Sequence, residues 1–456
     1  MRGVGTSGIG VSPTRADITA GRGDGPGENQ AFLRDLTPLA GAASPPAGES
    51  LSSAHDRAAR DGLRPLADAG PGVTTTEGPP SSPVRWLVVR GLAILLVLVM
   101  VEVGVRLVAM ISVGPRILLY GTPWHRAHSA PAPNKGGVEF HAMEGDGYTK
   151  YFPHEEKWAK DSRGRYRVHI NAHGLRGAEF DDRKRPGVRR VLTLGASSTF
   201  GFENRDDETY PYYLQKVLDR IDGPGHFEVI NFAVPHADTD AIVNMFLAEG
   251  VPLQPDVVTV YEGVNDSERA VFDAMYGTTW RKSGESHFLT ITLLKKLAQA
   301  VLPKPTRVTV TPAIIDAGIQ GYLHNLDAIA AACNRIGARM IVVTQQARSY
   351  LVEPDKLHGL TYEDEAQIAT AALESPDSAT KWNAMQLSLG AMFVVHSHVT
   401  PAVRDWARTH SVPLVDGVAV LDRQRDYLLT WVHLAPPANK VLAKAIAAEI
   451  IEVTGR

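Results

Sequence analysis

A serine between two glycines is the first residue of this sequence that could do chemistry. Ser197 lies in the run Gly195-Ala196-Ser197-Ser198-Thr199-Phe200-Gly201, directly after the apolar residues 191–194. The apolar run predicts a short buried strand, and residues 210–220 predict a helix beyond the turn. Such a turn exposes the serine hydroxyl, and backbone N–H groups at the start of a helix stabilise a developing oxyanion. Ser197 is therefore a candidate nucleophile, although many serines in such turns have no chemical role.

Two other strand–turn–helix motifs are excluded by single residues. A Walker phosphate loop ends in Gly-Lys followed by Ser or Thr, whereas Gly201 is followed by Phe202. The nucleophile elbow of α/β-hydrolases has glycine two residues after the serine, where this chain has Thr199. Catalysis by Ser197 would therefore depend on partners from elsewhere in the chain.

Three further polar stretches lie at the ends of predicted elements. They are residues 231–239, residues 262–266 (Glu-Gly-Val-Asn-Asp) and residues 431–433 (Trp-Val-His), the last just before the final predicted helix. Because the carboxyl ends of parallel strands meet at one edge of a sheet, we expect these stretches to converge on the edge that carries Ser197.

Strands and helices alternate from residue 191 onward and would position these stretches. Predicted strands occupy residues 191–194, 228–232, 257–261, 338–344 and 412–415, and predicted helices occupy residues 210–220, 238–249, 316–336, 401–410 and 437–453. This alternation predicts one α/β domain, with a doubly wound parallel sheet flanked by helices on both faces.

The four stretches together resemble the sequence blocks of the GDSL, or SGNH, hydrolase superfamily of esterases and lipases. The family's Gly-Asp-Ser-x-Thr-x-Gly aligns with residues 195–201, its second block with residues 231–236, its Gly-x-Asn-Asp with residues 263–266, and its Asp-x-x-His with residues 430–433. Residues 171–177 are similar to a stretch that precedes the first block in membrane-linked members. The resemblance covers the chain from about residue 165 to its end and implies an SGNH-hydrolase-like, flavodoxin-like three-layer fold.

The resemblance also implies roles for the matched residues. Ser197 would be the nucleophile and His433 the general base. The Asn265 side chain would form the oxyanion hole with backbone N–H groups of Ser197 and of the second block. The residues that would complete or support this hole are Gly195, His236, Gly263 and Asp266.

The chain departs from the family pattern at three positions. Ala196 replaces the aspartate before the serine, His236 stands where the second block has glycine, and Thr430 replaces the aspartate before the histidine. In a triad the loss of the acid costs about 10⁴ in rate, because the acid orients the imidazole. The candidates for this role are Asp426, Asp422, Thr430 itself or a backbone carbonyl.

The region before the α/β domain divides by composition. Residues 1–83 are rich in Gly, Pro, Ala and Ser and predict a disordered tail. Residues 84–113 are apolar over a length that predicts one transmembrane helix. Residues 114–164 predict a linker with edge elements, and residues 165–456 the hydrolase-like domain.

The predicted membrane helix carries two opposite charges. Glu102 and Arg106 are one helical turn apart and are expected to pair. Arginines on both sides of the apolar stretch do not decide its orientation. We expect a single-pass membrane protein with its catalytic domain on the extracytoplasmic side.

Composition excludes several other classes of protein. A net charge of −3 argues against a general nucleic-acid binder. The single cysteine, Cys333, excludes an internal disulfide and a cysteine-based zinc site. His396 and His398 have no third ligand at a fitting spacing and are expected in a polar loop, so no metal or cofactor is predicted. Residues 267–312 and 351–399 are candidates for a lid or a wall of the acyl site.

These observations predict a membrane-anchored serine ester hydrolase without a cofactor. Its substrate would be an ester-bearing molecule such as an acylated envelope glycan or a lipid. O-acyl transfer would use the same residues. A catalytically weak or non-catalytic protein for glycan binding or assembly is the third interpretation, favoured by Thr430 and His236.

Overall fold

The computed structural model describes residues 83–113, 115, 117–120, 125–127, 148–277, 288–301 and 309–455. The predicted tail therefore lies outside the described residues, apart from its last position. The chain divides into two compact units, one of Met1–Ser82 with Leu293–Leu302 and one of Pro83–Thr292 with Pro303–Arg456. In the first unit the described residues belong to helix α9 (Leu289–Val301), and the second unit contains the sheet.

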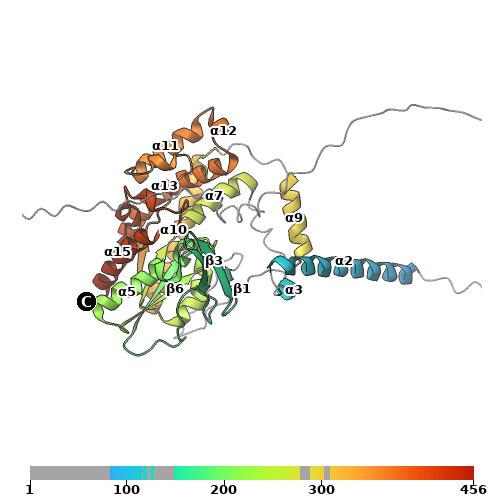
Figure 1. Ribbon diagram of the computed structural model, residues 1–456, viewed down its shortest axis with the longest axis horizontal. Helices are drawn as coiled ribbons and strands as arrows, with labels where there is room; N and C mark the ends of the chain where they lie inside the picture. The colour runs from blue at the N-terminus through green and yellow to red at the C-terminus, as the bar shows by residue number, and fades with distance from the viewer. Residues whose placement is uncertain are drawn as a thin grey trace, which may run out of the picture. The chain divides into compact units, whose positions relative to one another are not determined.

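A five-stranded parallel sheet forms the centre of the second unit (Figure 1). Its strand order is β6-β5-β7-β8-β9, which is the flavodoxin-like order predicted for this fold class. Gly195 at the end of β5 pairs with Ala233 of β6 and Tyr261 of β7, so these three strands end at one edge. The strands are β5 (Arg189–Gly195), β6 (Phe227–Ala233), β7 (Val257–Tyr261), β8 (Arg339–Val343) and β9 (Leu414–Val415).

Helices cover both faces of this sheet because its strands are apolar on both sides. Alternate residues of one strand point to opposite faces, and Val191 packs with α5 (Tyr210–Asp222) and α15 (Pro436–Thr454). Its neighbour Leu192 packs into a second core on the other face. That core is built by α6 (Thr239–Met245), α7 (Val264–Tyr276), α10 (Pro312–Ile336), α11 (Tyr362–Glu374) and α13 (Ala384–His410). The predicted three-layer α/β fold is confirmed.

The expectation of a polar loop at His396 and His398 is wrong. Residues 351–399 contain α11, α12 (Ser378–Lys381) and most of α13, and α13 contributes fully buried residues such as Ala391 and Val395 to the core. His396 and His398 therefore lie within a helix and not in a polar loop. The predicted helix start at Pro401 fails because this proline is tolerated inside a long, packed helix, although proline usually marks a first turn.

The α/β domain begins before the boundary predicted at residue 165. That boundary cuts through β4 (Gly164–His169), which pairs along its whole length with β3 (Glu156–Asp161). Tyr151, Val168 and Ile170 pack against Phe200, directly behind the serine turn. Residues from Tyr148 onward therefore belong to the same folded unit as the sheet.

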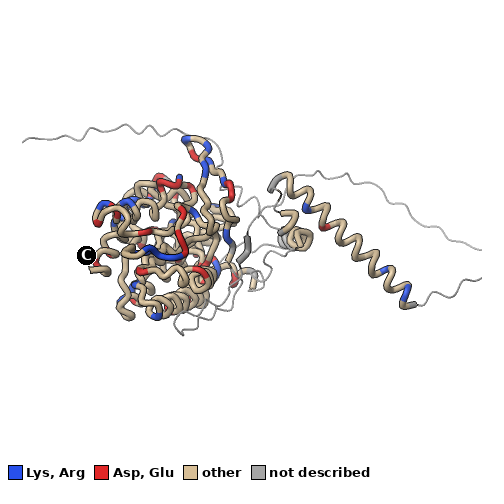
Figure 2. The backbone as a smooth tube through the Cα atoms, turned by 90° about the horizontal axis from the view of Figure 1, so that it is seen from below, with Lys and Arg blue, Asp and Glu red and all other residues tan. Residues whose placement is uncertain are grey.

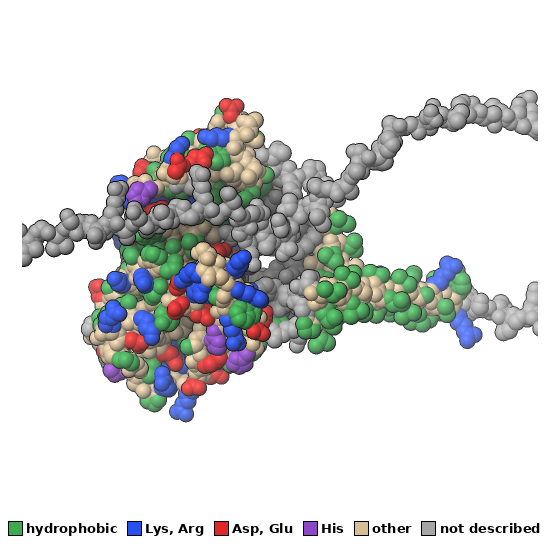
Figure 3. Space-filling model, in the orientation of Figure 1, with side chains coloured by type: hydrophobic (Ala, Val, Ile, Leu, Met, Phe, Trp, Pro, Cys, Tyr) green, Lys and Arg blue, Asp and Glu red, His purple; other side chains and the backbone are tan. Residues whose placement is uncertain are grey.

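Helix α2 (Pro83–Val113) consists mainly of apolar residues. Figure 3 shows hydrophobic side chains along the face of this helix that is in view. Its segment Val84–Ile111 is long and apolar enough to cross a membrane, with only 6% of its most apolar window buried. Few charges interrupt it (Figure 2), and the predicted pair is present, with Arg106 Nε 2.7 Å from Glu102 Oε1. The Glu102 carboxylate also accepts the backbone N–H groups of Leu289 and Thr290 at the start of α9.

The remaining elements are short. They are α3 (Ile117–Tyr120), β1 (His125–Ala127), β2 (Tyr148–Lys150), α4 (Ser197–Phe200), η1 (Asp206–Glu208), η2 (Phe246–Gly250), η3 (Val251–Leu253), η4 (Pro354–Lys356), α14 (Gly417–Val420) and η5 (Arg425–Tyr427).

Candidate active site

Ser197 and His433 lie within hydrogen-bonding distance of each other. Ser197 opens the one-turn helix α4 directly after β5, and His433 lies in the loop before α15. The Nε2 atom of His433 is 2.9 Å from the Oγ atom of Ser197, although 236 positions separate the two residues. This is the geometry in which an imidazole can accept the proton of a serine hydroxyl.

Glycine at position 195 lets the serine turn fold tightly onto β7. A Cβ atom at Gly195 would lie 2.1 Å from Thr199 Oγ1 and 2.7 Å from the carbonyl oxygen of Tyr261. No side chain can be accommodated at those distances without moving α4. Gly195 therefore sets how closely α4, and with it Ser197, approaches the end of the sheet.

The imidazole of His433 is enclosed and lacks an acidic partner. The ring of Phe202 meets it edge to face, with 5.6 Å between centroids. Its Nδ1 atom is buried and has no hydrogen-bond partner among the described residues. Burial, together with the nearby His236, lowers the pKa of His433 to about 3. The ring is thus neutral at pH 7, as a general base must be.

None of the three candidate acids contacts this ring nitrogen. Thr430 Oγ1 accepts the backbone N–H groups of His433 (3.1 Å) and Val432 (3.3 Å), so it orders the loop and not the ring. Asp422 accepts the backbone N–H of Tyr362, and Asp426 lies 3.5 Å from His358. None of these three candidates donates to or accepts from the imidazole ring in the described residues.

Asn265 lies in the first turn of α7 with one amide hydrogen committed. Its Nδ2 atom donates to the carbonyl oxygen of Ala237 at 2.7 Å, which fixes the side chain and leaves its second N–H available. Gly263, at the start of α7, has a φ of 139°, which favours glycine. His236 adopts a left-handed conformation with a φ of 61°, at the position where glycine was expected.

Residues 193–376 match the GDSL-like lipase/acylhydrolase family. The chain carries a GDSL-like acylhydrolase domain. The matched residues include the stretches that hold Ser197 and Asn265 and end before the loop of His433. The match of these residues supports an enzyme that hydrolyses ester bonds.

Several solved structures are similar to this acylhydrolase chain. The acetylxylan esterase Axe2 from Geobacillus stearothermophilus is 15% identical over 57% of this chain and 94% of its own, with a TM-score of 0.35. A GDSL-like lipase described from Parabacteroides merdae is 13% identical over 59% of this chain and 95% of its own, with a TM-score of 0.35. A protein described as lipolytic and of the G-D-S-L family, from Desulfitobacterium hafniense, is 10% identical over 57% and 98%, with a TM-score of 0.34. No curated protein matches the chain.

Asp266 stabilises the candidate site through hydrogen bonds to Thr239 at the start of α6. Its carboxylate accepts the hydroxyl of Thr239 at 2.5 Å and the backbone N–H of the same residue at 3.2 Å, and Arg269 lies 3.5 Å away. Burial raises the pKa of Asp266 to about 7. Asp266 thus ties the start of α6 to α7, so that the second and third sequence blocks are held together.

Glu262 is a functional residue that the sequence did not single out. One carboxyl oxygen accepts the backbone N–H of Ala196 at 3.1 Å, and the other accepts that of Asn265 at 3.0 Å. Burial, with the charge of Asp266, raises the pKa of Glu262 to about 8. The sequence does contain a signal for this role. A glutamate directly after an apolar strand is expected to be buried, and a buried carboxyl group needs hydrogen-bond partners. Glu262 joins the serine turn to the asparagine turn.

Gln345 was also missed; it links two sequence blocks directly and a third through Ser198. Its Oε1 atom accepts the N–H of Val264 at 2.9 Å, and its Nε2 donates to Ser198 Oγ at 3.3 Å. Ser198 in turn donates to the carbonyl oxygen of Val432. The residue beside the candidate nucleophile is thereby tied to the residue beside the candidate base.

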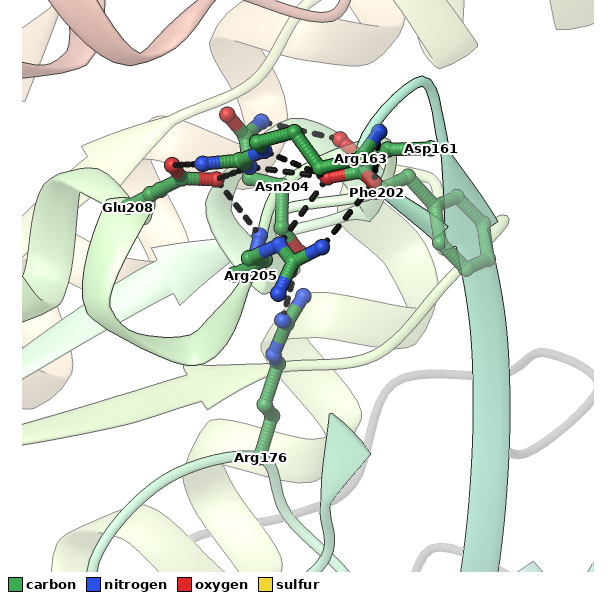
Figure 4. Close-up of polar contacts among 7 residues, drawn as sticks. All are labelled: Asp161, Arg163, Arg176, Phe202, Asn204, Arg205 and Glu208. Atoms are coloured by element: carbon green, nitrogen blue, oxygen red, sulfur yellow. Dashed lines mark hydrogen bonds and ion pairs between the residues drawn. The ribbon is translucent and has the colours of Figure 1, made fainter. Parts of the chain in front are cut away.

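A network of hydrogen bonds and ion pairs made by arginines stabilises the serine turn (Figure 4). Arg176 is buried and donates to the carbonyl oxygens of Phe200, Gly201 and Asn204, as well as to Asp206. Around it, Asp161 and Arg163 of the β3–β4 hairpin pair with Arg205 and Glu208. The stretch at residues 171–177 therefore serves to hold the turn that carries Ser197.

The described part of the chain contains no candidate metal-binding site. No group of three or more His, Cys, Asp or Glu residues there is arranged to hold a metal ion. Cys333 is buried in α10, as expected for a small core residue.

Proposed function

We propose that the protein is a membrane-anchored carboxylesterase or O-acyl esterase that uses Ser197 as nucleophile and His433 as general base. The observation that carries the proposal is the 2.9 Å distance between His433 Nε2 and Ser197 Oγ. It is supported by the low pKa of His433, which keeps the imidazole neutral and able to accept a proton at pH 7.

The proposed reaction proceeds in two balanced halves. His433 Nε2 takes the hydroxyl proton as Ser197 Oγ attacks the ester carbonyl, and the imidazolium then protonates the leaving alcohol. The same base next removes a proton from water, which attacks the acyl-serine and releases the carboxylic acid. The free N–H of Asn265 and the backbone N–H groups of Ser197 and His236 stabilise the oxyanion in both halves.

The unpartnered Nδ1 atom makes this a two-residue centre. Without a carboxylate, the imidazolium formed during attack gains less stabilisation, so we expect a slow enzyme. This observation, with the left-handed His236, also supports a second candidate: a catalytically weak or non-catalytic protein that binds a glycan on the same fold.

Membrane anchoring by α2 is part of the proposal. Its apolar segment Val84–Ile111 has the length and composition of a bilayer span, and the Glu102–Arg106 pair neutralises the charges within it. An anchored esterase suits an immobile substrate, so we propose an acylated envelope glycan or lipid on the extracytoplasmic side as its ester.

The test is ester turnover by the full-length protein in detergent. We expect slow hydrolysis of 4-nitrophenyl acetate, with loss of about 10³-fold or more in kcat for Ser197→Ala and for His433→Ala. Ser388→Ala, on the exposed face of α13, is the matched control and should retain the wild-type rate. Equal rates for the wild type and Ser197→Ala, together with glycan binding by both, would establish the non-catalytic function.

A further inference from the structure

A buried arginine without an ion pair among the described residues lies beside the loop that carries His433. Arg348 follows β8, and its backbone N–H donates to the carbonyl oxygen of Trp431 at 2.8 Å, two residues before His433. Its guanidinium stacks on the ring of Tyr350, 4.8 Å from the centroid. Arg348 is therefore attached through its backbone to the loop that carries the candidate base.

Arg348 is buried and forms no ion pair among the described residues. The residue exposes 9% of its surface, and its Nε atom is buried with no hydrogen-bond partner among the described residues. The negative charge of Glu365 acts on Arg348 from a distance. Both carboxylate oxygens of Glu365 already have partners, because Oε1 accepts the N–H of Ser349 and Oε2 accepts from Arg425. Burial accordingly lowers the pKa of Arg348.

The other buried arginines in the described residues are all paired. Arg176, Arg190 and Arg425 are buried at least as deeply, and each donates both to a carboxylate and to backbone carbonyl oxygens. An isolated buried charge costs several kcal/mol, which is why such pairing is general. Arg348 lacks the compensation that this domain gives to its structural arginines.

We propose that Arg348 is an anion-binding residue of the substrate site and that the ester substrate carries a carboxylate or phosphate group. A planar guanidinium offers paired N–H donors that match two oxygens of such a group, and the ligand would supply the missing counter-charge. This inference rests on the proposed esterase function, because the anion would belong to the molecule whose ester reaches Ser197.

The experiment compares two activated esters with the same leaving group, using the full-length protein in detergent. The neutral ester is 4-nitrophenyl butyrate, and the anionic ester is mono-4-nitrophenyl glutarate. The variants are Arg348→Met and Arg348→Lys, and the control is Arg423→Met, an exposed arginine of the neighbouring loop. Inorganic phosphate is used as an inhibitor in the same assays and is titrated calorimetrically onto Ser197→Ala.

We expect the ratio of kcat/KM for the anionic ester to that for the neutral ester to fall at least tenfold in Arg348→Met. Arg348→Lys should give a smaller fall, and Arg423→Met none. Preference for the glutarate ester without phosphate inhibition identifies a carboxylate, and phosphate inhibition that is lost in Arg348→Met identifies a phosphate. If Arg348→Met does not fold, the Arg348→Lys ratio decides.

An unchanged ratio in both variants would overturn the proposal and leave Arg348 a structural residue of the loop. The proposed esterase function can fail separately. If the wild type hydrolyses neither ester, phosphate binding to Ser197→Ala that is lost in the double variant with Arg348→Met still supports the anion site. Absence of both turnover and phosphate binding rejects both.

Discussion

At the scale of single residues, the unpartnered nitrogen of His433 is the feature with the clearest chemical consequence. Thr430→Asp should place a carboxylate in the buried position from which Thr430 now orders the backbone of His433. The carboxylate would accept the Nδ1 hydrogen and stabilise the imidazolium. We expect kcat with 4-nitrophenyl acetate to rise about tenfold or more.

The same substitution should move the pH profile. A general base works only when neutral, so the burial-lowered pKa of His433 predicts wild-type activity that persists far below pH 6.5. A neighbouring carboxylate raises the pKa of an imidazole, so the acidic midpoint of Thr430→Asp should shift upward. Thr430→Asn has a similar shape without the charge and should shift neither quantity. If the rate and the acidic midpoint of Thr430→Asp equal those of the wild type, His433 Nδ1 already has a hydrogen-bond partner in solution.

At the scale of elements, the position of the serine turn depends on the segment before the sheet. Arg176→Met would leave the buried carbonyl oxygens of Phe200, Gly201 and Asn204 without their donor. At about 1–3 kcal/mol for each of the three unsatisfied groups, we expect a loss of roughly 3–9 kcal/mol in unfolding free energy and a lower kcat. Arg163→Met removes an exposed ion pair of the same network and should cost less than about 1 kcal/mol.

Urea unfolding and kcat of both variants check this prediction. If Arg163→Met loses as much unfolding free energy as Arg176→Met, the serine turn is stabilised by the surface ion pairs of the hairpin and not by the buried arginine.

The sequence predicted those elements whose signal is local. Apolar strands and the spacing of the blocks located β5, β6, β7 and α15 within a few residues. Helix α13 was shortened because Pro401 carries a local signal for a helix start, which tertiary packing overrides. The serine, histidine and asparagine were found through the blocks. Glu262, Gln345 and Arg348 were not, because their roles follow from contacts made across 60 or more positions of chain.

At the scale of the whole molecule, α2 should determine where the protein resides. Its apolar side chains are exposed along most of its length, which is costly in water and favourable in a bilayer. We expect carbonate extraction to leave the full-length protein in the membrane fraction. Replacing Leu95 and Leu98 by arginine should release it, since charges at the centre of a span cost about 2.5–3.5 kcal/mol each. Recovery of the unaltered protein in the soluble fraction would refute the anchor.

Glu262 and Asp266 should each contribute less stability as the pH rises from about 4 to about 8, a trend opposite to that of the buried histidine His433 below pH 6.5. The pKa of Glu262 is about 8 against an ordinary value of 4.5, and that of Asp266 is about 7 against 3.8, both raised chiefly by burial. Within that window the folded protein keeps protons that the unfolded chain releases, so each pH unit lowers the unfolding free energy by up to about 1.4 kcal/mol per group. Glu262→Gln removes one of these groups and should flatten the dependence of unfolding free energy on pH, measured by urea unfolding of the full-length protein in detergent. Glu452→Gln, on the exposed end of α15, should leave that slope unchanged. A slope in Glu262→Gln equal to that of the wild type would mean that Glu262 is ionised in the folded protein, and the serine and asparagine turns would then be joined by a carboxylate instead of a neutral acid.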